Sequence, residues 1–472
     1  MRPRLNHILT KGLLGASSAR PPRRLQFTLA AEEPRPLEMV PGPTRWPVLG
    51  SLPALAMHPA TTKNRLYLLT DSLFREYGDI FRIHLPCQPP LVFICHPDDI
   101  EQVHRTNFDL PHRDFFESYG LARSHNKFFR KGQTGVFSEW ASLRDAHDEL
   151  PDDYLHQVFR WALETLGLVT FNKRLGCLDN TPDALRMIKV SDDLISGLHE
   201  LEMGSFVRFW RWVDTPALRK VKRAQDEMLR FVQASVLESQ RSLQSRNPES
   251  KEELNIVENL LLDPVLTYED VHAFLIDVFF AGIDTTSLSL TYTMMRLAQN
   301  QDKQKKLQEE LDNVLRNGVE VLSTHHIKEL RYLKACVKEA LRMDPPLICV
   351  VRKTTRDMVL RGYMVPKGTN MQIYSRGSSM NEEFFPKATQ FLPERWLRDS
   401  SSNAIHPYAS LPFGAGVRNC VGRRFAEQEI HILLARLFHK YRLEWHYEPL
   451  NPVLNMLMLP DKPLRFTMKE RR

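Results

Sequence analysis

The sequence has few of the features that mark extracellular, fibrous or membrane-spanning proteins. Its six cysteines lie far apart among 472 residues and form no Cys-X-X-Cys pair. This argues against a zinc ribbon or a disulfide framework and favours a reducing compartment. No apolar run reaches the roughly 18 uninterrupted residues of a membrane span, and there is no internal repeat or low-complexity linker. With 42% hydrophobic and 26% charged residues, the composition is that of an ordinary globular chain.

Acidic residues are missing from the first 31 positions, where six arginines and lysines precede Glu32, the first acid. A basic, acid-free segment rich in serine and leucine is typical of a mitochondrial transit peptide, and a disordered basic tail is the alternative. Of the 64 lysines and arginines only those six lie there, so the others nearly balance the 57 acids. The charge of the remaining chain therefore does not indicate nucleic-acid binding.

The remaining sequence predicts one domain. Residues 32–53 contain a proline cluster, which predicts an extended hinge, and residues 54–472 form the folded domain. Residues 79–98 have strand-like runs, and residues 154–345 show helical periodicity throughout. Strand and turn signals return at residues 348–375. The pattern predicts a mainly α fold with small β-sheets.

The sequence PFGAGVRNCVG, residues 412–422, places one cysteine in a glycine-rich loop just before an amphipathic helix. Glycines let the backbone turn tightly around the sulfur, and the helix N-terminus favours a thiolate at Cys420. Such a thiolate can bind a metal or haem. A buried structural cysteine is the alternative, although it would not need so specialised a loop.

The loop fits the pattern FxxGxRxCxG through Phe413, Gly416, Arg418, Cys420 and Gly422, and it resembles the haem-binding signature of the cytochrome P-450 family. The resemblance extends from the proline cluster to the final strands. It implies the cytochrome P-450 fold, a helix-rich single domain around a buried haem b (iron protoporphyrin IX). It also implies that Cys420 is the axial haem-iron ligand, and that the protein is a monooxygenase inserting one oxygen atom from O2 into its substrate.

Two further motifs precede the cysteine loop in the same order along the chain as in the family. Glu339 and Arg342 lie three residues apart on a predicted helix, and Arg395 lies in the segment PERW. The resemblance implies that these three residues form a partly buried charge triad behind the haem. An exposed helix pair, worth only about 0.3–0.5 kcal/mol, is the alternative.

The segment AGIDTT, residues 281–286, interrupts an otherwise apolar helix. Ala281 and Gly282 leave space for a ligand, and a threonine side chain can bend the local hydrogen-bond ladder. The segment resembles the family's oxygen-activation groove, in which Thr285 would hydrogen-bond activated oxygen and Asp284 would relay protons. A polar strip that faces another helix is the alternative.

Arginines suit haem propionates because their planar forks bind carboxylates through two hydrogen bonds. By position, Arg352, Arg418 and the pair Trp140 and Arg144 match such residues in the family, with surface ion pairs as the alternative. The helix of Trp140 and Arg144 has little length left before Pro151, where the family places the rest of this helix and another one. The sequence therefore predicts an internal deletion after about residue 144, from a shortened isoform or an imperfect gene model, and a chain that holds haem poorly.

A basic patch is predicted from Lys334 and Lys338, one helical turn apart, and from Arg423 and Arg424, directly after the cysteine loop. In mitochondrial members of the family such residues dock an acidic iron–sulfur protein. The resemblance therefore implies electron delivery by an adrenodoxin-type 2Fe–2S ferredoxin and its NADPH reductase. A solvated helix face is the alternative.

Aromatic residues and arginines alternate in residues 205–220, which suits peripheral contact with a bilayer interface; packing beneath a loop is the alternative. The aromatic residues are Phe206, Phe209, Trp210 and Trp212. Residues 110–130, Phe279, Phe280 and 347–351 are expected to line the substrate site. Their apolar character indicates a lipophilic substrate, steroid-like or xenobiotic. Together with the leader, these features predict an enzyme on the matrix side of the inner mitochondrial membrane.

Two other functions are compatible with the same motifs. One is a haem-binding but catalytically impaired protein, such as a shortened isoform. The other is an enzyme of the same fold that isomerises a peroxide without a redox partner. Retention of Asp284, Thr285 and the basic patch argues against both, because neither function needs proton relay together with ferredoxin docking.

Overall fold

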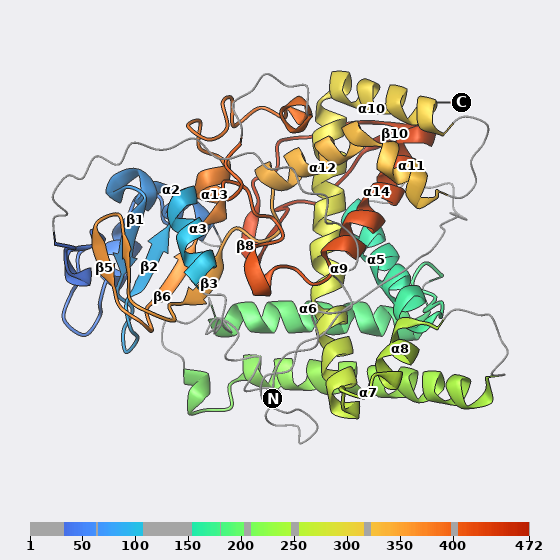
Figure 1. Cartoon of the computed structure of the whole chain (residues 1–472), viewed down its shortest axis with the longest axis horizontal. Helices are drawn as coiled ribbons and strands as arrows, with labels where there is room; N and C mark the ends of the chain where they lie inside the picture. The colour runs from blue at the N-terminus through green and yellow to red at the C-terminus, as the bar shows by residue number, and fades with distance from the viewer. Residues whose placement is uncertain are drawn as a thin grey trace, which may run out of the picture.

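The computed structural model describes residues 33–62, 65–106, 153–179, 181–202, 209–246, 254–315, 322–397 and 405–471. This part of the chain contains thirteen α-helices and ten short strands, which confirms the predicted mainly α fold. In Figure 1 the long helices fill the centre and right of the molecule, and the largest sheet lies at the left beside α2 and α3. The predicted transit peptide and the site of the predicted deletion lie outside the described residues.

The helical part contains nine of these helices. They are α5 (Tyr154–Phe171), α6 (Pro182–Glu202), α7 (Pro216–Ser245), α8 (Ile256–Leu262), α9 (Tyr268–Gln299), α10 (Gln301–Val314), α11 (Thr324–Glu329), α12 (Arg331–Met343) and α14 (Arg423–Lys440). The others are α1 (Leu52–Met57), α2 (Leu66–Tyr77), α3 (Pro97–Thr106) and α13 (Ser375–Ser379). Short 3-10 helices are η1 (Leu37–Met39), η3 (Phe209–Arg211), η4 (Pro393–Trp396) and η5 (Gly416–Arg418).

Helix α9 forms the centre of the helical part and packs against α5, α7, α12 and α14 (Figure 1). Its first turn is closed by a capping box between Thr267 and Asp270, the pattern that favours a helix start at this point. It is the one helix in the described residues with the length and mean hydropathy, 1.5, of a membrane span. Because 72% of that window is buried, its apolar surface packs against the protein's own helices.

The largest sheet has four strands in the order β1-β2-β6-β3. Strands β1 (Ile80–Ile83) and β2 (Leu91–Ile94) lie in residues 79–98, where strands are predicted, and pair antiparallel; β6 (Asn370–Ile373) joins β2 in parallel. Strand β3 (Val350–Lys353) closes the sheet antiparallel to β6. Two-stranded sheets complete the fold. They consist of β4 (Met358–Leu360) with β5 (Tyr363–Val365), β8 (Val453–Asn455) with β9 (Leu457–Leu459), and β7 (Tyr441–Glu444) with β10 (Thr467–Glu470).

The proline-rich segment, predicted as a hinge over residues 32–53, docks on the largest sheet at Val40 and Pro41. Val40 is 2% exposed and belongs to the apolar cluster of this sheet. The backbone N–H of Arg82 in β1 donates to the carbonyl of Pro41 over 2.8 Å. The expected hinge is therefore corrected to a docked segment. Extended backbone fixed by prolines presents free carbonyls that a neighbouring strand can bind.

A buried carboxylate joins α12 to η4. The Glu339 carboxylate accepts two hydrogen bonds from Arg342, of 2.9 and 2.8 Å, and one of 3.0 Å from Arg395. Trp396 donates its indole N–H over 2.8 Å, and the backbone N–H of Leu392 donates over 3.1 Å. Glu339 and Arg342 are both completely buried. The structure thus brings Glu339, Arg342 and Arg395 together in one cluster.

The guanidinium of Arg342 also donates to the carbonyls of Ser379, at the end of α13, and Ala388, each within 2.8 Å. These bonds occupy donors that the carboxylate cannot reach. Satisfying all groups of a buried ion pair offsets the cost of removing the charges from water. The cluster therefore fixes α12, α13 and the segment before η4 relative to one another.

We expect Glu339→Gln to destabilise the protein by about 3–5 kcal/mol, because it leaves the buried Arg342 without its counter-charge. Chemical unfolding followed by circular dichroism measures this loss. The matched control is Lys189→Ala, which removes an exposed ion pair with Asp193 on α6 and should change stability by less than about 1 kcal/mol. Equal stabilities of the two variants would contradict the structural role of the cluster.

Candidate active site

The loop around Cys420 has the tight geometry that its glycines allow. Gly414 and Gly416 have φ values of +68° and +72°, in the left-handed region that favours glycine. The backbone N–H of Cys420 donates to the carbonyl of Phe413 over 2.7 Å, which closes the loop. Cys420 is followed two residues later by Gly422, the N-cap of α14. The sulfur thus lies near a helix N-terminus, where a thiolate is favoured.

Cys420 differs from most of the other cysteines in its exposure. Burial raises the pKa of the thiols of Cys95, Cys177 and Cys336, and it raises the pKa of Cys349 to about 12. These four side chains are therefore protonated near neutral pH. Cys420 is exposed, as is Cys87, which lies outside any glycine-rich loop. The adjacent Val421 is also 52% exposed, so an apolar and a thiol side chain are presented together.

The middle of α9 has two different faces. Asp284 is 5% exposed, and its carboxylate accepts a 2.9 Å hydrogen bond from the hydroxyl of Ser191 on α6. Burial raises the pKa of Asp284 to about 7. Thr285 is only partly buried, and its hydroxyl donates to the carbonyl of Ala281, which is exposed. A hydroxyl-bearing open face and a buried acid therefore come from consecutive residues.

Basic groups gather where β3 and α3 approach the cysteine loop. Arg352 is 2% exposed. The pKa of His104 is lowered to about 4, first by the burial of its ring and then by the positive charge of Arg352. Nε2 of His104 is buried and has no hydrogen-bond partner. Arg418 is half-buried in η5. Trp140 and Arg144, the other predicted propionate ligands, lie outside the described residues.

These residues fit a haem. A thiol in a loop of small residues suits the iron, and buried basic groups suit propionate carboxylates. The unpartnered Nε2 of His104 beside Arg352 is an independent sign that a carboxylate is accommodated there, since an orphaned buried polar atom is costly. No sequence signal points to His104, because it belongs to no motif, and only the approach of α3 to the cysteine loop identifies it.

The four residues of the predicted basic patch lie on α12 and α14, two helices that pack together. Lys338, Arg423 and Arg424 are exposed and Lys334 is half-buried. The pKa of His431 on α14 is lowered to about 3, first by burial and then by the charges of Lys334 and Lys338. The two lysines on α12 therefore act on the middle of α14, about two helical turns after Arg423 and Arg424.

Two expectations about aromatic residues need correction. Phe279 is fully buried and stacks on Phe171 at 5.6 Å between ring centroids. The Phe279 ring therefore packs in the core between α5, α7 and α9. Successive residues of a helix point about 100° apart, so an apolar run on a helix does not place all its side chains on the substrate side. Trp210 is 3% exposed and donates its indole N–H to the carbonyl of Leu201, so it cannot reach a bilayer. Trp212 is 72% exposed.

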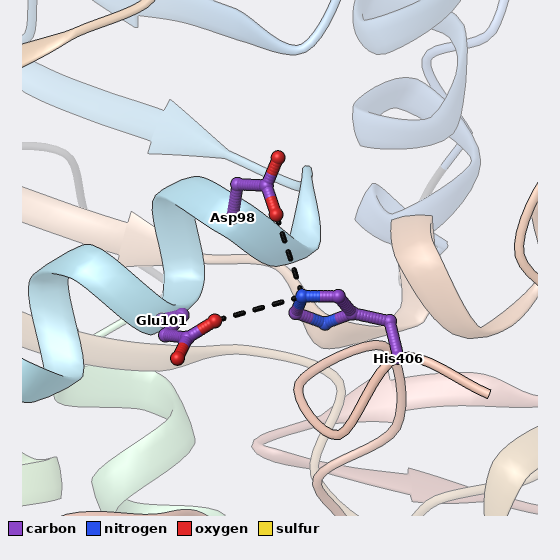
Figure 2. Close-up of side chains that lie close together, drawn as sticks. All are labelled: Asp98, Glu101 and His406. Carbon is purple, nitrogen blue, oxygen red and sulfur yellow. Dashed lines mark ion pairs between the residues drawn. The ribbon is translucent and has the colours of Figure 1, made fainter. Parts of the chain in front are cut away.

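A cluster of one histidine and two acids ties α3 to the segment before the cysteine loop. Figure 2 shows Nε2 of His406 between the carboxylates of Asp98 and Glu101, at 3.3 and 3.5 Å. Nδ1 of His406 accepts the backbone N–H of Tyr408 over 3.2 Å. The proton of the neutral ring is therefore on Nε2, which donates to the acids. Although the residue types resemble a metal site, this nitrogen has no lone pair to offer in this arrangement.

Comparison with known proteins agrees with this geometry. The family model described as Cytochrome P450 matches residues 40–144 and 122–468. The probable cytochrome P450 49a1 of Drosophila melanogaster is 32% identical over 92% of this chain and 83% of its own length. The probable mitochondrial cytochrome P450 12a5 of the same species is 31% identical over 84% of each chain. Cytochrome P450 CYP12A2 of Musca domestica is 32% identical over 67% of this chain and 62% of its own length.

The family match covers most of the chain, and it includes the cysteine loop, the Glu339 cluster and the polar segment of α9. The fold, the loop geometry and the matched residues lead to the same conclusion. The chain belongs to the cytochrome P450 family, whose members are monooxygenases that bind haem b.

Proposed function

We propose that this protein is a mitochondrial cytochrome P450 that receives electrons from an adrenodoxin-type 2Fe–2S ferredoxin and oxidises a lipophilic substrate. The observation that carries the proposal is the exposed Cys420 in a closed glycine loop before α14, next to a basic surface. Members of the family called mitochondrial, among them the 12a5 and 301a1 proteins of Drosophila melanogaster, support the compartment.

Haem b, when bound, supplies the iron at which O2 is activated. Cys420 would hold the haem iron through its thiolate, within a loop whose shape depends on Phe413, Gly416 and Gly422. Arg352 and Arg418, with Trp140 and Arg144, are the proposed propionate ligands, and His104 is added to them by its unpartnered Nε2. A propionate beside the imidazole would favour its protonated form and so offset the low pKa that burial imposes.

Asp284 and Thr285 are the proposed proton-handling residues. A carboxyl group whose pKa lies near 7 can both give and take a proton at neutral pH, which is the property a relay needs. The hydroxyl of Thr285 lies on the open face of α9, where its one proton is donated to the carbonyl of Ala281. Rotation of the hydroxyl would let it donate to an oxygen atom at this face instead. The proton is held at a carboxyl oxygen of Asp284 and at Oγ1 of Thr285.

The proposed redox-partner surface consists of Lys334, Lys338, Arg423 and Arg424. Electrostatic complementarity with an acidic ferredoxin would mainly accelerate the encounter. We also propose that residues 1–31 are a transit peptide and that the folded enzyme lies on the matrix side of the inner membrane. The exposed Trp212 and Val213, 72% and 61% exposed, support peripheral contact with its lipids.

An internal deletion after about residue 144 is part of the proposal. The alignment with the 49a1 protein extends over 491 positions but includes only 92% of the 472 residues of this chain. More than fifty aligned positions of that relative therefore have no counterpart here. The alignment with the 301a1 protein covers 499 positions and 94% of this chain. It also leaves more than fifty positions without a counterpart here. A shortened helix at Trp140 and Arg144 would weaken the grip on haem.

We expect Cys420→Ala to abolish the thiolate-type absorption band of the reduced carbon monoxide complex, because the iron loses its sulfur ligand. Cys87→Ala, which removes the other exposed cysteine, is the control and should keep the band. Absorption spectra of both purified variants decide the matter. Persistence of the band in Cys420→Ala would show that the ligand is a different residue.

We expect Lys338→Glu to slow reduction by an adrenodoxin-type ferredoxin about tenfold at low salt, because it reverses a charge in the docking surface. The deficit should shrink as salt screens the surface. Stopped-flow reduction under carbon monoxide measures the rate. Lys367→Glu, an exposed lysine in the turn between β5 and β6, is the control; equal rates for the two variants would contradict the assigned surface.

Insertion of the corresponding segment of the 49a1 relative after Arg144 should raise the haem content per chain and slow thermal inactivation, because it would restore a full helix for Trp140 and Arg144. Haem is quantified by absorption against protein concentration. If the natural chain and the lengthened chain hold haem equally well, the missing segment is dispensable and the chain is a complete enzyme without it.

A further inference from the structure

The buried acid of α9 is held by a residue of another helix. Ser191 on α6 is 2% exposed, and its hydroxyl donates to Oδ2 of Asp284 over 2.9 Å. Among the described groups that act on Asp284, none is a base, and the one charge is that of Asp192, which is negative. A single neutral hydrogen bond thus fixes the position of this carboxyl group on the α6 side of α9.

The next residue of the same helix, Thr285, lies on its open face. The Thr285 hydroxyl is bonded to the carbonyl of Ala281, and both residues lie on the less buried side of α9. Asp284, by contrast, faces α6, so its carboxyl is directed away from the side where Thr285 would meet oxygen. Rotation about its side-chain bonds is the short path from one side to the other, because Asp284 and Thr285 are consecutive residues of one helical turn.

The charged groups near Ser191 on the α6 side are exposed. Asp192, next to Ser191, is exposed, and the charge of the exposed His156 on α5 acts on it. A proton taken from water in this region can reach Asp284 through the hydroxyl of Ser191, which can accept one hydrogen bond while it donates another. The buried acid therefore lies between a solvent-side donor and an oxygen-side acceptor.

We propose that Ser191 is a positioning residue of the reaction: its hydroxyl holds the Asp284 carboxyl on the solvent side, and the carboxyl turns to the Thr285 side when this bond opens. The proton leaves a carboxyl oxygen of Asp284 for the oxygen side, and a proton from water on the α6 side replaces it. This inference rests on the proposed proton-handling role of Asp284. It adds a residue of α6 to the proton supply of α9.

The first test is the pH titration of the Asp284 carboxyl by infrared difference spectroscopy, with Asp284→Asn as the reference. Ser191→Ala removes a hydrogen bond donated to the carboxylate, so the pKa of Asp284 should rise by about 0.5 pH unit or more. Ser191→Thr keeps the hydroxyl and should restore the titration. Ser196→Ala, which removes another hydroxyl of α6 bonded to the carbonyl of Asp192, is the matched control and should leave it unchanged.

The second test is the peroxide formed per NADPH consumed by the haem-loaded protein, with an adrenodoxin-type ferredoxin and its reductase and without added substrate. Ser191→Ala should increase this ratio about threefold or more, because proton supply is slowed. Haem content and the reduced carbon monoxide spectrum should match those of Ser196→Ala. These two measurements separate a positioning effect from a loss of structure.

The outcomes also separate the role of Ser191 from the role of Asp284. If Asp284→Asn changes the ratio but Ser191→Ala changes neither the ratio nor the titration, the inference about Ser191 is wrong and the role of Asp284 stands. If Asp284→Asn itself leaves the ratio unchanged, the proposed role of Asp284 is wrong. A failure of the ferredoxin to reduce the protein contradicts the proposed partner, while the infrared titration still decides whether Ser191 controls the carboxyl.

Discussion

The buried Glu339 carboxylate is the interaction on which the rest of the site depends. An ionised group in a dry interior costs several kcal/mol unless all its lone pairs are bonded. The carboxylate is satisfied only when Arg342 of α12, Arg395 and Trp396 of η4, and the Leu392 backbone arrive together. The chain then continues from η4 toward the cysteine loop and α14, which packs on α12. The position of Cys420 is thus linked to one ion cluster.

Helix α9 performs two tasks because consecutive residues point in different directions. Asp284 is directed to α6 and Thr285 to the open face, so a buried acid and an accessible hydroxyl share one helical turn. Burial raises the pKa of the acid to about 7, and the serine bond partly offsets this rise. In an apolar helix such a pair would only lower stability. Its presence is understandable if the reaction needs protons on one side and excludes bulk water from the other.

Several parts of the fold and site were predictable because local rules decide them. The capping box of Thr267 and Asp270 begins α9, a start that residue types three positions apart are enough to specify. The strand-like runs of residues 79–98 form β1 and β2. The prediction was wrong for Phe279 and Trp210 because a list of apolar residues does not tell which face of a helix meets the core. It was also wrong for the proline-rich hinge, since docking on β1 depends on a sheet formed by residues far away in the sequence.

The sequence by itself determined the chemistry of the site: a cysteine in a glycine loop, a polar segment in an apolar helix, and an ordered set of charged motifs. These are properties of short segments, in which spacing and residue type fix local conformation. Only the tertiary structure decided which groups meet. Arg342 bonds to carbonyls 37 and 46 residues away, Ser191 reaches Asp284 from another helix, and His104 approaches Arg352 and the cysteine loop. Such contacts depend on how helices and sheets pack, and no local pattern encodes that packing.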